Sequence, residues 1–394
     1  MCNRHWSVAI DIMAGNHHDD DDKSDHRPDI WIESQKLLKT SLNVQREHGY
    51  LYGYSTLVFI GSHFGGKSSI INRFIDQTKS TNDLSKYEET IALEYRYLCR
   101  QIDSSAMDNR LRQQQDQLFY ENNMKICNIW ELGHELLFID LLKFTINNHT
   151  INNNVSLIIV IDLTQPNKMA TLLDNIIKWI RKHLQSILSI DHQTCEQMQQ
   201  LSLKRSIYYR SDNENNENRP KNPLLIPVTI IGSKYDEYQN MDPEIKKQIT
   251  RYLRTISYEL GGQIIYHSNR SDTLTKRVNQ AFESLAFDRL TFDQEDRSKP
   301  SVSTNIAKPI LLPFGYDTVA KIGIESTSTM DQVRQQFEKI FPQIDLEQSY
   351  QSTMGDIDPR FDTNFAEPEI DKILEYKYML LDGGGGGGNK NRTK

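Results

Sequence analysis

Six short stretches between residues 50 and 290 are rich in apolar side chains, and most are continuous apolar runs rather than alternating ones. A continuous run is typical of a strand buried on both faces, as in a parallel sheet covered by helices. One of the six mixes charged with apolar residues, which suits a strand at the edge of the sheet. The predicted strands are 56–61, 91–99 (the mixed one), 125–131, 155–162, 226–232 and 264–267.

Between these strands the apolar positions recur with helical spacing. In one such stretch Asp242 suits an N-cap and Pro243 the first turn, while Gly261 and Gly262 end the run. Residues 168–190 carry a second apolar stripe, which we expect to pack into the core rather than to bind a partner. Strands that alternate with helices predict an α/β fold with a six-stranded, mainly parallel sheet flanked by helices.

The composition changes at both ends of this α/β region. Residues 1–48 and 293–394 are polar, so both are predicted to be largely irregular extensions of a domain that spans 49–292. Within the domain, residues 191–222 are rich in Gln, Asn and Arg and follow no period, which indicates a surface insertion.

One stretch of the C-terminal extension, 367–381, is amphipathic. It places Ile370, Ile373, Leu374 and Tyr378 on one face, and no element follows on which that face would pack. We therefore favour docking of these four residues on a partner protein over the alternative, in which the segment folds back on the domain. The six glycines that follow are typical of a flexible linker or a low-complexity tail.

An acidic run near the N-terminus, HHDDDDK at 17–23, has two interpretations. It resembles an engineered tag with a protease site, and it equally fits a native acidic patch. Histidines beside aspartates have metal-ligand chemistry, but a run of like charges is more typical of a solvated surface than of a metal site.

Charge and cysteine content argue against several functional classes. The formal net charge of −7 over 394 residues gives no reason to expect nucleic acid as a partner. The four cysteines are never spaced C-x-x-C, so we expect no disulfide framework or zinc site, and a reducing compartment fits. The N-terminus lacks a signal-peptide core, and the longest apolar run, 157–161, is too short to span a bilayer. We expect a soluble intracellular protein without membrane insertion.

The segment GSHFGGKS at 61–68 matches the phosphate-loop pattern G-x-x-x-x-G-K-[ST] in full, between a predicted strand and a predicted helix. The glycines let successive N–H groups turn toward phosphate oxygens, and the helix adds the partial positive charge of its N-terminus. Lys67 is expected to reach the β- and γ-phosphates, and the Ser68 hydroxyl to hold Mg²⁺. The predicted phosphate-binding residues are Gly61, Ser62, His63, Phe64, Gly65, Gly66, Lys67, Ser68 and Ser69.

Further positions would complete a site for a guanine nucleotide. Thr90 precedes the second strand, where a threonine can contact Mg²⁺ and the γ-phosphate. Lys234 and Asp236 follow the fifth strand in a Ser-Lys-x-Asp motif, close to the guanine-reading Asn-Lys-x-Asp. Ser268 follows the sixth strand, where it would support the base. A loop threonine and a surface turn are the plain alternatives to these roles.

The segment WELGHE at 130–135 departs from a working nucleotide switch. A switch needs D-x-x-G here, with an Asp that holds Mg²⁺ through water and a Gly amide that senses the γ-phosphate. If Glu131 replaces the Asp, His134 occupies the glycine position; if Gly133 is the sensing glycine, Trp130 occupies the Asp position. Both registers stay open and neither is complete, so we expect neither efficient hydrolysis nor a clean on/off switch.

The chain resembles the dynein light intermediate chain family, roughly from residue 50 to residue 380. The resemblance rests on spaced motifs in matching order: GSHFGGKSSIINRF, TIALEYRY, IWELGH, VIDLTQPN, IPVTIIGSKYDEYQ and YELGGQIIYHS. The late segment DPRFDTNFAEPEIDKILEYK and the short C-terminal part point to the dynein 2 branch of this family. The chain departs from that branch at His134, where a second glycine is usual, and at Ser68 and Ser69, where a threonine pair is common.

The resemblance implies a Ras-like domain that serves as a non-catalytic adaptor on the tail of the dynein 2 heavy chain, in retrograde intraflagellar transport and cilium assembly. It implies the heavy chain and the other dynein 2 subunits as partners, with microtubules contacted only indirectly. The implied locations are the cytoplasm, the cytoskeleton and the cilium, including its basal body and axoneme. The implied ligand of the phosphate loop is GTP or GDP with Mg²⁺.

Two other functional classes stay open. An active small GTPase that recruits effectors would need the segment 130–135 to work as a switch. An ATP-using enzyme such as a kinase would need an adenine site, which Lys234 and Asp236 argue against, and an arginine-rich lid, of which the sequence shows no sign.

Overall fold

The computed structural model describes most of the region predicted to be α/β, and some segments beyond it. All the described residues belong to one compact unit, Gly53–Lys394, while the other unit is Met1–Tyr52. The predicted N-terminal extension, the acidic run and the glycine run therefore lie outside the described residues. The described residues are 54–76, 90–101, 124–151, 154–189, 192–207, 220–287, 301–323, 330–346, 368–370, 372–373 and 376–377.

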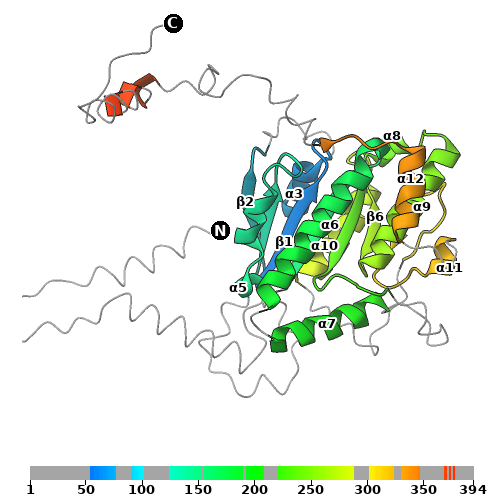
Figure 1. Ribbon diagram of the computed structural model, residues 1–394, viewed down its shortest axis with the longest axis horizontal. Coiled ribbons are helices and arrows are strands. Elements are labelled where there is room, and N and C mark those ends of the chain that lie inside the picture. Colours follow the sequence, from blue (N-terminus) through cyan, green and yellow to red (C-terminus); the bar gives the residue numbers. More distant parts are fainter. Residues whose placement is uncertain are drawn as a thin grey trace, which may run out of the picture. The chain divides into compact units, whose positions relative to one another are not determined.

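The described strands form one seven-stranded sheet in the order β2-β3-β1-β4-β5-β6-β7 (Figure 1). The central strands are parallel, and the two edge strands, β2 and β7, run antiparallel to their neighbours. The predicted mainly parallel sheet is confirmed: all six predicted strands are present, and one short strand is added. The strands are β1 (Tyr54–Gly61), β2 (Leu93–Gln101), β3 (Met124–Leu132), β4 (Val155–Asp162), β5 (Val228–Ser233), β6 (Gln263–Tyr266) and β7 (Leu311–Leu312).

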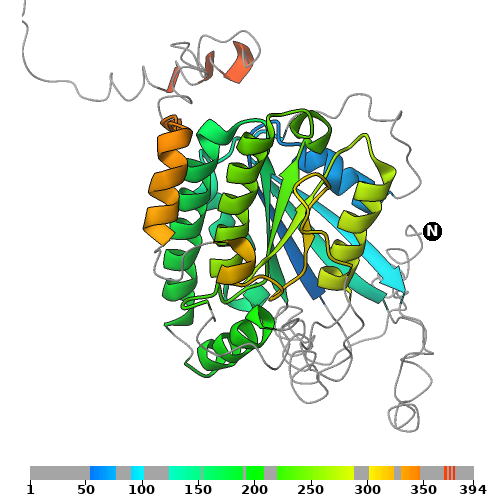
Figure 2. The same cartoon turned by 90° about the vertical axis from the view of Figure 1, so that its right-hand side faces the viewer.

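Helices cover both faces of the sheet, which completes the predicted α/β architecture (Figure 2). Helices α3 and α10 pack on one face, α4, α6 and α9 pack on the other, and α12 contacts α6 and α9. None of the described helices is both long and apolar enough to cross a membrane. The helices are α3 (Lys67–Ile75), the 3-10 helix η5 (Ile139–Leu141), α4 (Leu142–Thr145), α5 (Asn148–Ile151), α6 (Pro166–Leu188), α7 (His192–Ser206), α8 (Tyr235–Tyr238), α9 (Pro243–Glu259), α10 (Asp272–Ala286), α11 (Val319–Ile322) and α12 (Met330–Ile340).

The alternation of side chains along each central strand divides the core into two layers. Leu57 and Phe59 of β1 pack with α3 and α10, while Val58 and Ile60 pack with α6 and α9. All four side chains are fully buried. Since every position of such a strand faces one layer or the other, a continuous apolar run is required, as the sequence pattern indicated.

The helix predicted after Asp242 is confirmed as α9. The Asp242 side chain accepts a 2.8 Å hydrogen bond from the backbone N–H of Glu244, and Pro243 occupies the first turn. This is the N-cap arrangement that satisfies a donor which the first helical turn leaves without an intrahelical partner. The second predicted helix is also present, as α6.

Part of the region predicted to be an irregular C-terminal extension is packed into the domain. Residues 301–346 supply β7, α11 and α12, and Phe337 of α12 stacks on Tyr252 of α9 with ring centroids 4.1 Å apart. Arg254 and Asp317 form a buried ion pair between α9 and this segment. The predicted boundary at residue 292 therefore does not mark the end of the packed region.

The predicted surface insertion at 191–222 is also more ordered than its composition indicated. It contains the helix α7, and Arg205 near the end of that helix is 1% exposed. The Arg205 guanidinium donates to the backbone oxygens of Leu224, Ile226 and Gly261, which ties α7 to the segment before β5 and to the turn after α9. Because an arginine side chain and backbone carbonyl groups make this contact, α7 is held in place without a periodic pattern of apolar residues. The sequence therefore carried no sign that the helix packs on the domain.

Candidate nucleotide-phosphate site and exposed aromatic face

The phosphate loop joins β1 to α3 and encloses one end of a pocket. Gly66 precedes α3 with a φ of 86°, a left-handed conformation that glycine adopts without strain. Most of the predicted phosphate-binding residues and all three predicted switch residues meet at this pocket, whose volume is about 250 Å³. The pocket is lined by His63, Phe64, Gly65, Gly66, Lys67, Ser68, Ser69, Thr90, Glu131, Gly133 and His134.

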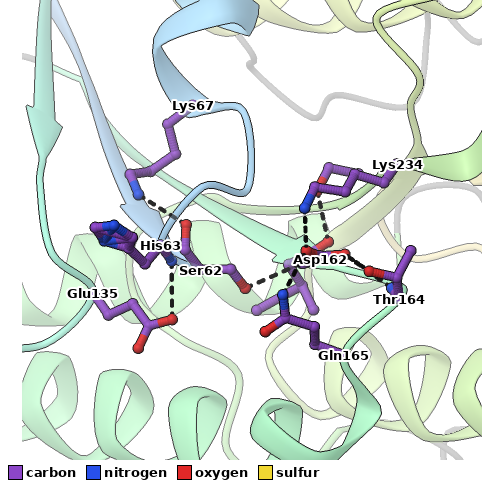
Figure 3. Close-up of polar contacts among 10 residues, drawn as sticks. Ser62, His63, Lys67, Glu135, Asp162, Thr164, Gln165 and Lys234 are labelled. Carbon is purple, nitrogen blue, oxygen red and sulfur yellow. Dashed lines mark hydrogen bonds and ion pairs between the residues drawn. The ribbon is translucent and has the colours of Figure 1, made fainter. Parts of the chain in front are cut away.

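Lys67 lies within the curve of this loop. Its side chain is 6% exposed, and Nζ donates to the backbone oxygens of Ser62 at 3.0 Å and Gly61 at 3.3 Å (Figure 3). The ammonium group is therefore held beside the N–H groups of the loop. An anion bound by those N–H groups would meet a fixed positive charge.

Ser68 and Glu131 contact each other at this pocket. Ser68 Oγ donates a 2.6 Å hydrogen bond to Glu131 Oε1, and Glu131 is only 3% exposed. Burial raises the pKa of Glu131, against the opposing effects of the Ser68 hydrogen bond and the charges of Lys67 and Arg96. Its Oε2 is buried and accepts no hydrogen bond from any residue that the structure describes. A hydroxyl and a buried carboxylate oxygen without a donor fit the ligand preference of Mg²⁺.

Thr90 reaches the same pocket from the segment that precedes β2. Its hydroxyl donates a 2.8 Å hydrogen bond to Glu94 Oε2. Arg96, two positions further along β2, holds the other oxygen of Glu94 through Nε at 3.0 Å and Nη2 at 2.7 Å. These contacts fix the position of the threonine that the sequence placed in the first switch.

The two registers of WELGHE differ in which side chain faces the phosphate loop. Glu131 faces Ser68, whereas the preceding Trp130 lies on the opposite face of the sheet with its ring 4.7 Å from that of Tyr95. Glu131 therefore lies at the pocket, as the first register requires, and Trp130 is not among the residues that line it.

Gly133 is required for packing. Its N–H donates to the backbone oxygen of Ala92 at 2.7 Å, and a Cβ at this position would lie 2.1 Å from the backbone oxygen of Thr90. The Gly133 amide is thus committed to the segment before β2. In the register that the structure adopts, His134 stands where a switch has its sensing glycine.

Glu135 follows at the position where an active GTPase has the glutamine that orients water. It is 3% exposed, and its Oε1 accepts a 2.9 Å hydrogen bond from the backbone N–H of His63 in the phosphate loop (Figure 3). His134 and Glu135 have φ values of 45° and 52°, which non-glycine residues rarely adopt. A carboxylate bonded to the loop is poorly suited to assist attack on a phosphate.

Asp162, the last residue of β4, connects the phosphate loop to the predicted base-reading lysine. Its N–H donates to Ser62 Oγ at 3.1 Å (Figure 3). Its carboxylate, 1% exposed, accepts from Lys234 Nζ at 2.6 Å and from Thr164 and Gln165. This network fixes the ends of β1, β4 and β5 relative to one another.

The predicted base-reading residues Lys234, Asp236 and Ser268 do not line the 250 Å³ pocket, and two of them contact each other. Asp236 Oδ1 accepts from Ser268 Oγ at 2.7 Å, and Oδ2 lies 3.3 Å from Nη1 of Arg270. The structure therefore brings Asp236 and Ser268 together, while their predicted role in binding the base stays a prediction. Lys234 is directed to Asp162 instead.

A cluster of aromatic side chains, two exposed tyrosines and a partly buried tryptophan, lies on the edge strand β2 and its neighbour β3. We call Tyr95, Tyr97 and Trp130 the aromatic face. Tyr95 and Tyr97 are 48% and 54% exposed and stack with ring centroids 6.4 Å apart, and Tyr95 also contacts Trp130. Large apolar side chains gathered on one exposed sheet face are typical of an interaction site.

The predicted docking residues of the C-terminal extension are described only in part. Ile370 and Ile373 are 52% and 55% exposed, which agrees with an unpacked apolar face. Leu374 and Tyr378 lie outside the described residues, so their role stays a prediction.

Sequence reasoning missed several residues of this site. Glu94 and Arg96 share one face of β2, and charged residues at a spacing of two along an apolar strand were the available signal. Asp162 closes an apolar parallel strand, a position that commonly faces a ligand. The sequence places Glu135 at the position of the water-orienting glutamine, but its contact with the loop has no sequence signal, because a turn of two left-handed residues brings the carboxylate there.

Comparisons with known proteins give a consistent result. The family model described as dynein light intermediate chain matches residues 107–226. The cytoplasmic dynein 2 light intermediate chain 1 of Danio rerio is 26% identical over 366 residues, which cover 89% of this chain and 91% of that protein. The human protein of the same name is 26% identical over 367 residues, or 90% of this chain and 94% of its own length.

Among solved structures, the crystal structure of the dynein light intermediate chain's conserved domain matches with a TM-score of 0.48 and 16% identity, over 74% of this chain and 91% of that one. The human cytoplasmic dynein 1 light intermediate chain 1 is 22% identical over 71% of this chain and 53% of its own length. The resemblance to the dynein light intermediate chain family that the sequence motifs predicted is therefore confirmed, and it extends along most of the chain for the cytoplasmic dynein 2 members.

Proposed function

We propose that this chain is a non-catalytic light intermediate chain subunit of a cytoplasmic dynein 2 complex. It docks on the tail of the heavy chain and supports retrograde intraflagellar transport and cilium assembly. The observation that carries the proposal is the similarity to cytoplasmic dynein 2 light intermediate chains over 89% of this chain and 91% of the Danio rerio protein. The match to the human dynein 1 protein covers only 53% of that protein, which favours dynein 2.

The aromatic face supports docking on the heavy-chain tail. It lies on the edge strand β2 and its neighbour β3, and its tyrosines are about half exposed. Tyrosine and tryptophan lose little side-chain entropy on binding and bury large areas, so they are enriched where interfaces gain most of their binding energy.

Co-purification with the dynein 2 heavy-chain tail tests this role. Replacing Tyr95 and Tyr97 together with glutamate should reduce recovery of the heavy chain at least about tenfold, the range expected when central aromatic anchors are lost. Leu201→Glu is the matched control, because Leu201 is a 43% exposed apolar residue on α7 and should not alter recovery. Unchanged recovery with the tyrosine variant, at an unchanged melting temperature, would remove the aromatic face from the interface.

The C-terminal face predicted from the sequence is tested in the same assay. Replacing Ile373 and Leu374 with aspartate should reduce recovery of the heavy chain if the segment 367–381 docks there. If recovery with this pair equals that of the unmodified chain, the segment is not a heavy-chain contact.

The phosphate loop, in this proposal, holds GTP or GDP as a structural ligand. Lys67 and the loop N–H groups would hold the phosphates, and Ser68 and Glu131 would hold Mg²⁺ where the metal accompanies the nucleotide. The metal supplies positive charge that neutralises phosphate oxygens. Glu135 replaces the glutamine that orients water for hydrolysis, and His134 replaces the glycine that senses the γ-phosphate. Both replacements support a nucleotide that stays bound and is not hydrolysed.

Mass spectrometry of small molecules released from gently purified chain should detect the bound nucleotide, and Lys67→Met should abolish it. Turnover of Mg²⁺-GTP by the purified chain tests the absence of catalysis. A rate at or above that of unassisted small GTPases would favour the active-switch alternative.

A further inference from the structure

Two carboxylates face each other across the β2–β3 ladder at the metal end of the phosphate pocket. Glu94 is directly opposite Glu131 in the antiparallel register, so both side chains lie on the same face of the sheet. Like charges in this arrangement destabilise a strand pair, and the burial of Glu131 adds a desolvation cost. A cation beside the two carboxylates would relieve this repulsion.

Arg96 is a cation of the chain that meets both carboxylates. Its Nη2 lies 2.7 Å from Glu94 Oε1 and 3.9 Å from Glu131 Oε2. Its Nη1 donates a 2.9 Å hydrogen bond to Asn72 Oδ1 on α3, and the side chain is 20% exposed. The guanidinium is thus held by the strand, by its bond to Glu94 and by helix α3, and it is not free to swing into solvent without breaking these contacts.

The position of Arg96 bears on the metal. In phosphate-loop sites that use Mg²⁺, the metal compensates the acidic residue at the position of Glu131. Here the Glu131 oxygen that the guanidinium approaches, at 3.9 Å, is Oε2, which accepts no hydrogen bond among the described residues. We propose that Arg96 replaces Mg²⁺ as the counter-cation of Glu131, and that the phosphate loop therefore binds its nucleotide without requiring the metal.

This inference rests on the proposed nucleotide binding and adds a statement about its metal dependence. The groups placed to hold phosphate, the loop N–H groups and Lys67, do not need a metal to be in position. A divalent ion between Ser68 and Glu131 would stand close to the fixed guanidinium, and the repulsion between the two cations would weaken its binding. Metal binding thus becomes optional.

Isothermal titration calorimetry of the full chain with GDP, in Mg²⁺ and separately in EDTA, tests the proposal. We expect the two dissociation constants to agree within about threefold, less than 1 kcal/mol. Arg96→Met removes the charge and keeps much of the apolar stem, and it should weaken GDP binding at least about tenfold in EDTA, with recovery in Mg²⁺. Arg100→Met is the matched control, since Arg100 lies on the same face of β2 but pairs with Glu283 at 2.9 Å.

A direct readout of the metal needs no nucleotide. Mg²⁺ should raise the melting temperature of the Arg96→Met chain and leave those of the unmodified chain and the Arg100→Met chain unchanged. GDP binding by the unmodified chain that is lost in EDTA would overturn the role of Arg96 while leaving the nucleotide site in place. Absence of GDP binding in both conditions would overturn both. Neither result alters the recovery of the dynein heavy chain, which tests the subunit role separately.

Discussion

Replacing Asp317 with alanine is expected to destabilise the domain strongly, because Asp317 joins the segment after residue 300 to the core. Its carboxylate receives two hydrogen bonds from Arg254, Nε to Oδ2 at 2.9 Å and Nη2 to Oδ1 at 2.5 Å. Both residues are 8% exposed. After the substitution, the buried Arg254 guanidinium loses both of these bonds. Among the described residues it then keeps only its hydrogen bond to the backbone oxygen of Lys321, at 3.1 Å.

The expected magnitude follows from this burial. Removing one partner of a buried ion pair costs about 3–5 kcal/mol, because the other charge is left uncompensated. The free energy of unfolding of a domain is roughly 5–15 kcal/mol, so the substitution removes a large share of the stability. With a urea slope near the upper end of the usual range, about 3 kcal/mol/M, the unfolding midpoint should fall by about 1 M or more.

The assay is urea unfolding followed by circular dichroism, with two comparisons. Lys247→Ala breaks an exposed pair with Glu244 on the same helix, whose side chains are 57% and 63% exposed, and should cost less than about 0.5 kcal/mol. Arg254→Met combined with Asp317→Leu removes both buried charges and should restore stability to within about 1 kcal/mol of the unmodified chain. The reasoning fails if Asp317→Ala costs less than about 1 kcal/mol, or if the double variant is as unstable as the single one.

Three further outcomes are expected. Burial lowers the pKa of His267 to about 4, below the usual value of 6.5, so the unfolded chain binds this proton more readily and stability should fall below pH 6.5. Urea unfolding should show a loss of about 2 kcal/mol from pH 7 to pH 5 that His267→Gln removes; an equal loss in both chains would contradict it. Gly133→Ala should cost roughly 3 kcal/mol in the same assay at pH 7, because its Cβ would lie 2.1 Å from the Thr90 oxygen, and a cost near zero would refute this packing. A chain truncated after residue 292 should not unfold cooperatively, whereas one truncated after 346 should keep the full urea midpoint; a cooperative transition in the shorter chain would restore the boundary predicted from composition.

The sequence pattern predicted the central strands well for a physical reason. All eight residues of β4 are buried, so its apolar run has no gap, and its ends coincide with those predicted at 155–162. β7 has only two residues, and a pair of leucines carries no period. Its place in the sheet follows from pairing with β6, a contact between distant parts of the chain that composition does not encode.

The residues of the candidate site differ in the same way: local sequence patterns predict some of them, whereas contacts between distant parts of the chain determine others. The loop residues were predicted together because they are consecutive, whereas Asp236 and Ser268 were predicted separately, from the motifs that follow the fifth and sixth strands. The structure brings these two together because both strands are parallel and their carboxyl ends meet at one edge of the sheet. The contacts of Glu131 with Ser68 and Arg96 join three separate elements. The sequence left two registers open at this point, and the face of β3 on which Glu131 lies decides between them.

The groups that would bind phosphate in this chain also stabilise the fold. This gives a reason why a phosphate loop can be retained in a domain that does not hydrolyse a nucleotide. Lys67 donates to two loop carbonyls, and Ser62 accepts from the N–H of Asp162, so the loop is fastened to β4 by the loop residues themselves. The residues that hydrolysis would need are different ones, and Glu135 at the water-orienting position is bonded to the His63 amide. Because gripping and cleaving depend on separate side chains, the second can be lost while the first remains. A complete phosphate loop in such a domain is therefore an argument for an anion-binding scaffold, and by itself it is no argument for catalysis.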